Sequence, residues 1–388
     1  MDESFDVVIA GGAIMGAMTA YFLASDPVFR GSIAVVERDP GFARASTTLS
    51  AASLRQQFSI PANIRMSRFG LQVLREAGER FGADVALGWD EGGYLMLASA
   101  AGLPVLQANH AVQQAEGADI ALLDPAGLAA RFPYLNVEDI AAGALGLSGE
   151  GWFDAHALLA AVRRTIRNLG VRLIEGEVTS VDRADGRIAA VGLADGRRLR
   201  CGALVNAAGP SAGRLALLAG VALPVAPRKR CVFVLHCRTP LPHLPLLVDP
   251  SGFYVRPEGA YLIAGMPPEH DPDAEGDFEV DWPLFEETLW PALAHRIPAL
   301  EEVKAVRAWA GHYEMNLLDH NAVIGPHPEI ANLYFINGFS GHGLQQAPAA
   351  GRAIAEWITH GRSVSLDLDA FGYRRIAQGR PYRELNII

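Results

Sequence analysis

The sequence predicts an α/β fold with a Rossmann-like strand–turn–helix unit near each end of the chain and a different region, with paired strands, between them. Two observations support this fold class. The order strand, glycine turn and helix occurs at the start of the chain, over residues 5–23, and again near its end, over residues 333–359. Between these units, residues 252–256 and 260–265 have the pattern of paired strands, joined by Pro257-Glu258-Gly259.

The composition is that of a globular chain with a large core. Of the 388 residues, 50% are hydrophobic and 20% are charged, and a chain of this length exceeds one ordinary compact domain. The formal charge of −10 gives no electrostatic basis for binding nucleic acid or an anionic membrane. We therefore expect two domains and a small-molecule partner.

Cysteines and apolar runs bear on the compartment. Cys201, Cys231 and Cys237 form no CxxC pair and no zinc-type spacing, which favours a reducing, cytoplasmic setting without a metal site. The apolar stretch 7–24 follows an acidic flank and is punctuated by glycines, so we interpret it as folded structure and not as a signal peptide. No other apolar run reaches about 20 residues, so no membrane span is expected.

The first elements form the opening of a Rossmann-like unit. Residues 5–10 are an apolar β run, a glycine-rich turn follows, and a helical pattern extends through Leu23. A second β run, residues 32–36, ends at Glu37. This order of strand, glycine turn, helix and strand is typical of dinucleotide-binding folds.

The glycine turn has the features of a pyrophosphate site. Free N–H groups and the positive dipole end of a helix attract phosphate, provided that no side chain blocks the backbone. The strict GxGxxG pattern would have glycine in place of Ala13, and a purely structural turn is the alternative. The candidate cofactor-binding residues of this turn are Gly11, Gly12, Ala13, Ile14, Met15 and Gly16.

An acidic residue supports the dinucleotide interpretation. Glu37 stands about 20 residues past the motif, where a carboxylate accepts hydrogen bonds from a ribose diol. These features do not distinguish FAD from NAD. The N-terminal position of the motif and a polar run after Glu37 favour FAD, while a helix start capped by Ser46 or Thr47 is the alternative for that run. The candidate residues of the run are Arg38, Arg44, Ala45, Ser46, Thr47 and Thr48.

The later part of the chain alternates strands and turns in the same way. The pair Asp195-Gly196 is typical of a hairpin turn. After Gly338 a glycine turn leads into a helix predicted over residues 344–359, in which Pro348 falls in the first turn and Gly361 follows the end. The predicted strands are residues 171–174, 178–181, 203–206 and 333–337.

Taken together, these motifs resemble the D-amino-acid oxidase superfamily of FAD-dependent oxidoreductases, with the sarcosine oxidase, glycine oxidase and dimethylglycine dehydrogenase group nearest. The likeness runs nearly end to end. It is carried by residues 7–16, 46–50, 209–210 and 338–346. A closer likeness, to a mitochondrial flavoprotein associated with respiratory complex I assembly, is carried by residues 50–59, 309–314 and 338–348.

The resemblance implies a discontinuous Rossmann-like FAD-binding domain made of three segments, with an inserted α+β substrate domain, built on a mixed antiparallel sheet, that covers the flavin. The helix after Gly343 would point its N-terminus at the N1/O2 edge of the flavin, where its dipole stabilises the reduced, anionic ring. The FAD-binding domain comprises residues 1–88, 142–222 and 310–388, and the substrate domain residues 89–141 and 223–309. The further FAD contacts implied are Ser50, Ser53, Val178 beside the adenine, Ala208, Gly209, Gly338, Gly341, His342, Gly343, Leu344 and Gln345.

The source of electrons and the attachment of the flavin also follow from the resemblance. The sequence carries no second glycine fingerprint for NAD(P)H, so we expect electrons to come directly from an organic substrate. In amine-oxidising relatives, the neutral amine loses hydride to the flavin and water hydrolyses the resulting imine. Some relatives tether the flavin through a cysteine where this chain has about His312, so we expect FAD to be non-covalently bound.

Three residues are implied as substrate contacts. Arg55 matches an active-site arginine of the sarcosine oxidase pattern, and a cation is the usual anchor for a substrate carboxylate. Its alternative is a solvated arginine on a helix face. Tyr254 and Arg256 lie two residues apart on a predicted strand and so share a face, which is directed either at the flavin or at solvent.

Departures from the pattern limit what the resemblance implies. Sarcosine oxidases have lysines where this chain has Gln345 and Ile263 or a neighbour, so O2 and another electron acceptor are both open. Glu314 lies where relatives bind a carboxylate with arginine. It would repel an acid and attract a cation, so we expect a substrate with an extra amino group, or else a surface glutamate paired with a nearby arginine.

Two further features are weaker. His342 lies between two glycines of the closing turn, where it either orients the substrate or forms a hydrogen bond within the turn. The acidic run 271–279 has the spacing of a calcium loop, but Trp282 replaces the final bidentate glutamate. We therefore interpret it as a solvated acidic loop, and no metal is expected.

Three functions remain open from the sequence. The first is an FAD-dependent oxidase or dehydrogenase that acts on the carbon–nitrogen bond of a small secondary amine or amino acid. The second is a 2-hydroxy-acid dehydrogenase of the same superfamily. The third is a flavoprotein whose main role is to assist assembly of a larger complex. The oligomeric state is not indicated by the sequence.

Overall fold

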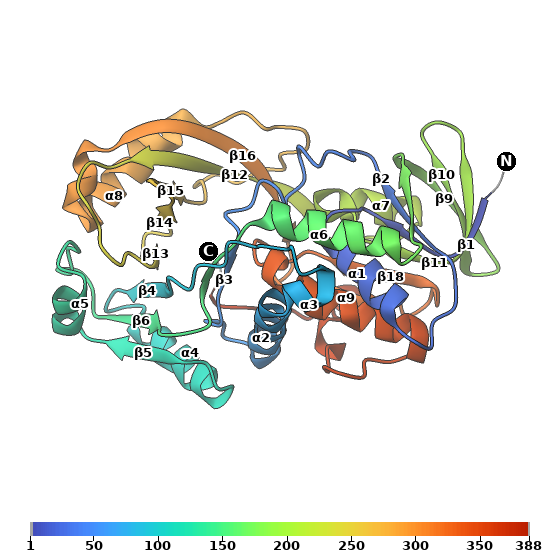
Figure 1. Cartoon of the computed structure of the whole chain (residues 1–388), viewed down its shortest axis with the longest axis horizontal. Coiled ribbons are helices and arrows are strands. Elements are labelled where there is room, and N and C mark those ends of the chain that lie inside the picture. The colour runs from blue at the N-terminus through green and yellow to red at the C-terminus, as the bar shows by residue number, and fades with distance from the viewer. Residues whose placement is uncertain (1–2, 387–388) are drawn as a thin grey trace.

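A computed structural model describes residues 3–386 and shows two large mixed sheets (Figure 1). The first sheet has the strand order β17-β18-β11-β1-β2-β8, with β10 and β9 continuing from one end of β11. The strands are β1 (Glu3–Ala10), β2 (Ile33–Glu37), β8 (Arg172–Glu175), β9 (Val178–Ala184), β10 (Arg187–Leu193), β11 (Arg198–Asn206), β17 (Val323–Pro326) and β18 (Leu333–Asn337).

The centre of the first sheet is parallel and buried on both faces. Val7 of β1 lies opposite Ile33 of β2 and Ala203 of β11, and β11 pairs in parallel with β18. Alternate residues serve the two faces: Val7 belongs to one apolar cluster and Val8 to the other. The predicted order of strand, turn, helix and strand is therefore confirmed.

Helices cover one face of this sheet side by side. Helices α6 (Ala155–Asn168), α1 (Ile14–Ser25) and α9 (Gly343–His360) share a core with β1 (Figure 1). The backbones of α1 and α9 approach closely at Gly351, where an added Cβ would lie 2.8 Å from the backbone of Met18. The opposite face is covered by α7 (Ala212–Leu218).

The second sheet has the order β16-β12-β15-β14-β13-β4-β6-β5. Its longest pair, β12 (Val225–His236) with β16 (Lys304–Asn316), is antiparallel from one end to the other. The remaining strands are β4 (Tyr94–Ala98), β5 (Ile120–Leu123), β6 (Ala142–Gly146), β13 (Leu246–Val248), β14 (Tyr254–Glu258) and β15 (Tyr261–Gly265). The other elements named in Figure 1 are α2 (Pro61–Arg75), α3 (Ala77–Phe81), α4 (Leu103–Ala115), α5 (Pro125–Arg131), α8 (Trp290–Arg296) and the short strand β3 (Ser53–Leu54), which pairs with β7 (Gly151–Trp152).

The predicted fold class, a Rossmann-like domain with an inserted domain on a mixed sheet, is confirmed. One turn was placed wrongly, because Glu258 pairs with Tyr261 and the turn is Gly259-Ala260, with Pro257 inside β14. The domain boundaries stay a prediction. Since β6 pairs with β4 and β5, we propose to extend the second domain through Gly146.

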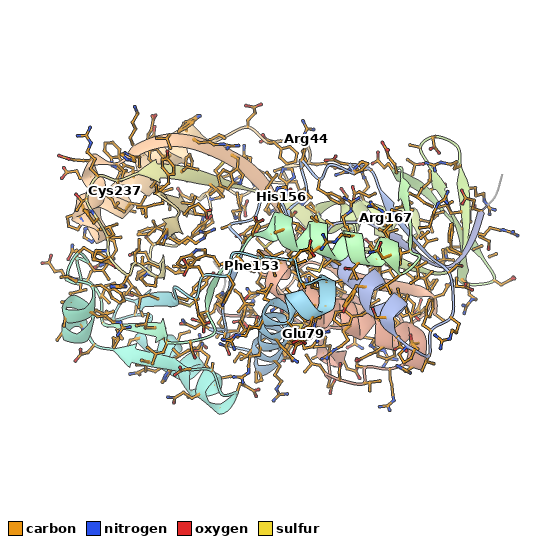
Figure 2. The ribbon with its side chains drawn as sticks, in the orientation of Figure 1. Arg44, Glu79, Phe153, His156, Arg167 and Cys237 are labelled. Atoms are coloured by element: carbon orange, nitrogen blue, oxygen red, sulfur yellow. The ribbon has the colours of Figure 1, made fainter. Side chains whose placement is uncertain are left out.

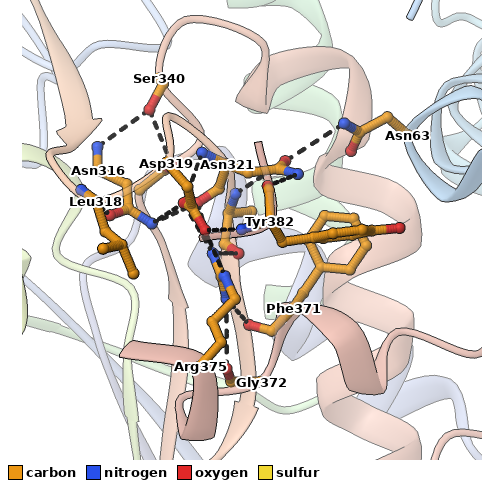
Figure 3. A network of polar contacts seen from close by, with 12 residues as sticks. Asn63, Asn316, Leu318, Asp319, Asn321, Ser340, Phe371, Gly372, Arg375 and Tyr382 are labelled. Carbon is orange, nitrogen blue, oxygen red and sulfur yellow. Dashed lines mark hydrogen bonds and ion pairs between the residues drawn. The ribbon is translucent and has the colours of Figure 1, made fainter. Parts of the chain in front are cut away.

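A buried ion pair fixes the C-terminal segment to the first sheet (Figure 3). Asp319 is 1% exposed and accepts hydrogen bonds from Arg375 Nε at 2.7 Å and from the backbone N–H of Tyr382 at 2.8 Å. Asn316 donates to the other oxygen of the same carboxylate. Arg375 also donates to the carbonyl of Ala322, so both charges are surrounded by partners.

We predict that Asp319→Ala destabilises the protein by about 3–5 kcal/mol, because Arg375 would be left buried without its counterion. Chemical denaturation measures the free energy of unfolding. The control is Asp84→Ala, which removes an exposed pair with Arg164 and should have little effect. Equal effects of the two substitutions would contradict the structural role given to Asp319.

Candidate functional site

A cleft of about 760 Å³ lies between the two sheets and contains residues from both glycine turns. The first sheet contributes the ends of β1, β2 and β11, and the second contributes β12, β14 and β16. In parallel α/β sheets, ligands bind at the carboxyl ends of the strands, which is where this cleft lies. Arg44, labelled in Figure 2, is exposed at its rim.

The first glycine turn can exist only with its glycines. Gly11 has φ +107°, and a Cβ there would lie 2.1 Å from the carbonyl oxygen of Ala207. A Cβ on Gly16 would lie 1.8 Å from the carbonyl oxygen of Gly11. Ala13 has φ −70°, a conformation open to any residue, which explains why this position tolerates alanine.

The start of helix α1 is directed at the cleft. Its N-cap residue, Ala13, provides no side-chain cap, and Ala13, Ile14 and Met15 all line the cleft. The N–H of Ile14 is 3.3 Å from Thr47 Oγ1. Such a helix start attracts an anion through its free N–H groups and its dipole.

Glu37 links the second strand to the turn. Its carboxylate accepts hydrogen bonds from the N–H of Gly12 at 2.8 Å and of Asp39 at 2.9 Å, and the residue lines the cleft. The side chain thus holds the glycine turn while it faces the place expected for a ribose.

The second glycine turn brings the N-terminus of α9 to the same cleft. Gly338 and Gly341 have φ +71° and +99°, and a Cβ on Gly341 would lie 2.3 Å from the ring of Tyr313. Gly343 and Leu344 line the cleft, and α9 begins without a side-chain cap. Two helices from opposite ends of the chain therefore point at one elongated cleft, a geometry that fits a dinucleotide.

The polar run after Glu37 is held by other backbone groups. Ser46 Oγ donates to the carbonyl of His312 at 2.7 Å, and Thr48 Oγ1 donates to the carbonyl of Ala45 at 2.9 Å. Arg44 lies over the ring of Phe278 at 5.1 Å. Of these three side chains only that of Arg44 is charged, and its exposed guanidinium can approach a phosphate in the cleft.

Most of the predicted cofactor residues line the cleft, and eight do not. Gly12, Gly16 and Gly338 shape the turns from behind, and Gln345 is directed away, since its Oε1 accepts the N–H of Arg55 at 2.7 Å. Those that line it are Gly11, Ala13, Ile14, Met15, Glu37, Arg38, Arg44, Ala45, Ser46, Thr47, Ser50, Ala208, Gly209, Gly341, Gly343 and Leu344. Outside the lining lie Gly12, Gly16, Thr48, Ser53, Val178, Gly338, His342 and Gln345.

Two of the predicted substrate contacts line the cleft, namely Tyr254 and Glu314. Glu314 is 8% exposed, and burial raises its pKa to about 8, against the opposing effect of hydrogen bonds from the backbone of Gly338 and Phe339. Its Oε2 has no hydrogen-bond partner among the described residues. The alternative of a surface glutamate paired with arginine is wrong, because the side chain is buried and forms no ion pair within residues 3–386.

Arg55 and Arg256 do not line the cleft, which corrects their expected position. Arg55 is 2% exposed, lies over the ring of Phe58 and donates to the carbonyls of Gln57 and Asn386. Arg256 donates to the carbonyl of Ala51 and to Glu258, although Tyr254 on the same strand faces the cleft. Backbone carbonyls satisfy both guanidinium groups.

His342 also lies behind the cleft wall. It is 4% exposed and contacts Phe58 edge to face at 5.4 Å, and burial lowers its pKa to about 3. Its imidazole is therefore neutral at physiological pH. The placement does not favour direct contact with the substrate, but the expected hydrogen bond of the side chain within the turn is not seen either, since Nε2 has no partner among the described residues.

The sequence did not point to Tyr313 and Arg230, which complete the wall of the cleft. Both Arg230 Nη atoms form hydrogen bonds of 2.8 Å with the carboxylate of Asp271, and the guanidinium lies 5.2 Å from the ring of Tyr313. The signal that could have found them is the complementarity between the basic run 228–230 and the acidic run 271–279.

The acidic run is largely exposed, as expected, but its acids are also paired with a neighbouring strand. Each of three successive residues of β12 pairs with one of its acids. Glu275, Gly276 and Phe278 of the same loop line the cleft. The pairs are Arg228 with Asp273, Lys229 with Asp277 and Arg230 with Asp271. No group of three potential metal ligands occurs within residues 3–386.

A second buried carboxyl lies behind the segment that carries Arg55. Glu150 is fully buried and accepts hydrogen bonds from the N–H of Gln56 and from Gln57 Nε2. A Cβ on Gly146 would lie 1.9 Å from Glu150 Oε2, so glycine makes room for this side chain. Desolvation raises the pKa of Glu150 to about 7, against the opposing effect of its hydrogen bonds and of Arg55.

We predict that Glu150→Gln changes the pH dependence of stability. Because the folded-state pKa lies above the usual value, the native protein loses stability as pH rises from about 4.5 through 7. Glutamine mimics the protonated carboxyl, so the variant should gain up to roughly 3 kcal/mol relative to the parent between pH 5 and 8. Denaturation of both holoproteins across this range measures the difference.

The control for Glu150 is Glu138→Gln, which removes an exposed carboxyl. Its stability should follow that of the parent at every pH. A free-energy difference between Glu150→Gln and the parent that stays constant from pH 5 to 8 would contradict the raised pKa.

These features define the fold of a dinucleotide-binding oxidoreductase, in which the second sheet covers the side of the cleft opposite the glycine turns. The sequence pattern described as "FAD dependent oxidoreductase" matches residues 6–357, and the chain belongs to this family. The "FAD-dependent oxidoreductase domain-containing protein 1" of Xenopus laevis is 42% identical over 426 residues, which cover 100% of this chain and 85% of that protein. FAD is therefore the cofactor, and the predicted likeness is confirmed.

Solved structures show the same fold. The L-proline dehydrogenase from P. horikoshii has a TM-score of 0.87 and 24% identity, covering 98% of this chain and 100% of that one. The glycine oxidase from Geobacillus kaustophilus has a TM-score of 0.81 and 23% identity, covering 95% and 98%.

Two other expectations concern membrane and compartment. None of the helices in the part of the chain that the structure describes has both the length and the apolar character needed to cross a bilayer. All three cysteines are free, and Cys237 lies at the far end of the second sheet region (Figure 2). The cytoplasmic setting stays a prediction.

We predict that Glu37→Gln weakens FAD binding by about ten- to a hundredfold, because it removes the charge from the hydrogen bond that fixes the turn and from the side chain expected at the ribose. Titration of apoprotein with FAD, followed by quenching of flavin fluorescence, measures the dissociation constant. In the control, Glu175→Gln, an exposed residue opposite Glu37 on β8 is changed. An unchanged dissociation constant for Glu37→Gln would remove Glu37 from the nucleotide site.

Proposed function

We propose that the protein oxidises the carbon–nitrogen bond of a small secondary amine or amino acid. The observation that carries the proposal is the end of the cleft beyond the two glycine turns. There Tyr254, Tyr313 and Met266 from the second sheet face Gly341 and Leu344 of the α9 turn. This wall offers the phenol groups of two tyrosines, whereas no lysine among the described residues lines the cleft.

The residues of both turns would hold FAD. The N-termini of α1 and α9 present free N–H groups, Glu37 stands at the ribose position, and Arg44 supplies a cation at the rim. FAD, when bound, supplies an acceptor for two electrons and the hydrogen of the substrate carbon. The cradle fits this group because both glycine turns exclude side chains from the backbone surface.

The chain's own residues position the substrate and limit water. The amine gives up hydride from its α-carbon and a proton from its nitrogen, a C=N bond forms, and water then hydrolyses the imine to a carbonyl compound and a released amine. This chemistry depends on alignment more than on acid–base strength. The hydroxyls of Tyr254 and Tyr313, with Glu314, are the polar groups available for alignment.

Burial favours a neutral substrate amine. Desolvation raises the pKa of Glu314 and also the pKa of Tyr254, so both groups favour their uncharged forms. A neutral amine is the form whose nitrogen lone pair assists departure of hydride. We infer that the cofactor is held without a covalent bond, since His312 Nε2 is 2.7 Å from the carbonyl of Asp277 and is thereby occupied.

We predict that, without oxygen, amines or amino acids bleach the flavin absorbance of the holoprotein. A panel of secondary amines, amino acids and 2-hydroxy acids tests this. The carbonyl product and the released amine should appear in equal amounts. Repeating the reaction in air with O2 or with an artificial acceptor identifies the oxidant for the second half-reaction.

The same panel separates the alternatives. Reduction by 2-hydroxy acids alone would replace C–N by C–O oxidation. If no compound reduced the flavin and a partner protein co-purified, a role in assembly would be supported instead. Tyr254→Phe with Tyr313→Phe should slow the reduction step while FAD occupancy is kept, because neither hydroxyl belongs to the glycine turns.

A further inference from the structure

The charged side chains around the cleft fall into two groups according to their partners. At the nucleotide end, Arg38 pairs with Glu177, and Glu275 pairs with Arg214. Glu37 is engaged by backbone N–H groups. At the other end, beside Tyr254 and Tyr313, the arginines already have partners, whereas one carboxyl has no counterion among the described residues.

The cations near that end already have partners among the described residues, although the buried Nε of Arg230 has none there. The guanidinium groups of Arg55 and Arg256 are 2% and 3% exposed, lie outside the lining, and donate to carbonyls of the chain. Arg230 lines the cleft, but both of its terminal nitrogens are bound by Asp271 at 2.8 Å. The arginine and the aspartate form a neutral pair.

Glu314, by contrast, is a carboxyl without a counterion. It lines the cleft, is 8% exposed, and its Oε2 finds no partner among the described residues. Its backbone carbonyl accepts the N–H of Ser340, which fixes the residue against the α9 turn. A buried polar atom without a partner costs free energy unless a ligand pairs with it.

We propose that Glu314 selects a substrate that carries a second, cationic amino group and no carboxylate. This inference rests on the proposed function and names its substrate class: mono-N-alkylated diamines in preference to amino acids. The secondary amine would be the reacting group, and the distal ammonium would bind the Glu314 carboxylate by a charge-assisted hydrogen bond.

Electrostatics in the cleft favours this choice. The carboxylate of an amino acid would gain no ion pair from Glu314, which would stay protonated, and Arg230, the arginine beside Tyr313 in the lining, is already paired with Asp271. A diamine instead supplies the missing positive charge. The ammonium would lower the raised pKa of Glu314, so binding releases a proton from it near neutral pH.

The experiment measures binding separately from turnover. Mono-N-methyl diamines of increasing chain length, each with the amino acid in which a carboxylate replaces the ammonium, are titrated into the oxidised holoprotein. Perturbation of the flavin spectrum gives the dissociation constants. We expect at least one diamine to bind at least about tenfold more tightly than its matching acid.

Variants connect the preference to one side chain. Glu314→Gln should remove the preference while FAD stays bound. The control is Glu275→Gln, since Glu275 lines the same cleft but is exposed and paired with Arg214, and it should keep the preference. The inference is overturned if no diamine binds, if the acids bind as tightly, or if the preference survives in Glu314→Gln.

Failure of the proposed function gives a different result. A diamine that binds through Glu314 but does not bleach the flavin without oxygen contradicts C–N oxidation and supports the charge selection. Amino acids that bind more tightly and bleach the flavin support C–N oxidation and overturn the charge selection.

Discussion

The site depends on close contacts of the backbone at two glycine turns, one with another backbone segment and one with an aromatic ring. Gly11 lies against the carbonyl of Ala207, and Gly341 lies under the ring of Tyr313, in each case at a distance that leaves no room for a Cβ. These contacts bring β1, β11 and β16 to one point and direct the N-termini of α1 and α9 into one cleft. The positive ends of the two helix dipoles therefore face the same space, and the strands of the second sheet form its opposite wall.

The sequence predicted local structure well and side-chain direction poorly. The first and last strand–turn–helix units follow from nearby glycines and apolar periodicity, so their bounds were close to those observed. The resemblance places Arg55 and Arg256 in the cleft. Their actual partners, such as the carbonyl of Asn386, lie hundreds of residues away in the chain, so the sequence gives no sign of them. Tyr313 and Arg230 were missed because the β12–β16 pairing that presents them is long-range.

Buried charge is distributed unevenly over the molecule. Asp319 and Arg375 balance each other behind the first sheet, and Arg296 is balanced by Asp249 in the second. Glu150 and Glu314 form no ion pair with a cation among the described residues. Burial raises the pKa of both carboxyls, and of the two only Glu314 lines the cleft, while Glu150 lies behind it.

The acidic loop that lines the cleft holds β12 from both sides. Arg228, Lys229 and Arg230 are consecutive strand residues, so their side chains alternate between the two faces of the sheet, yet each is paired with an acid of the same loop. Arg228 also forms a β-bridge with Asp273 along the edge of the strand. Ion pairs on both faces of β12 and a β-bridge at its edge hold this loop at several points, so it is not free to move about a single hinge. Its release requires that the three ion pairs break. Salt that screens these charges would weaken the wall of the cleft and expose the edge of β12 together.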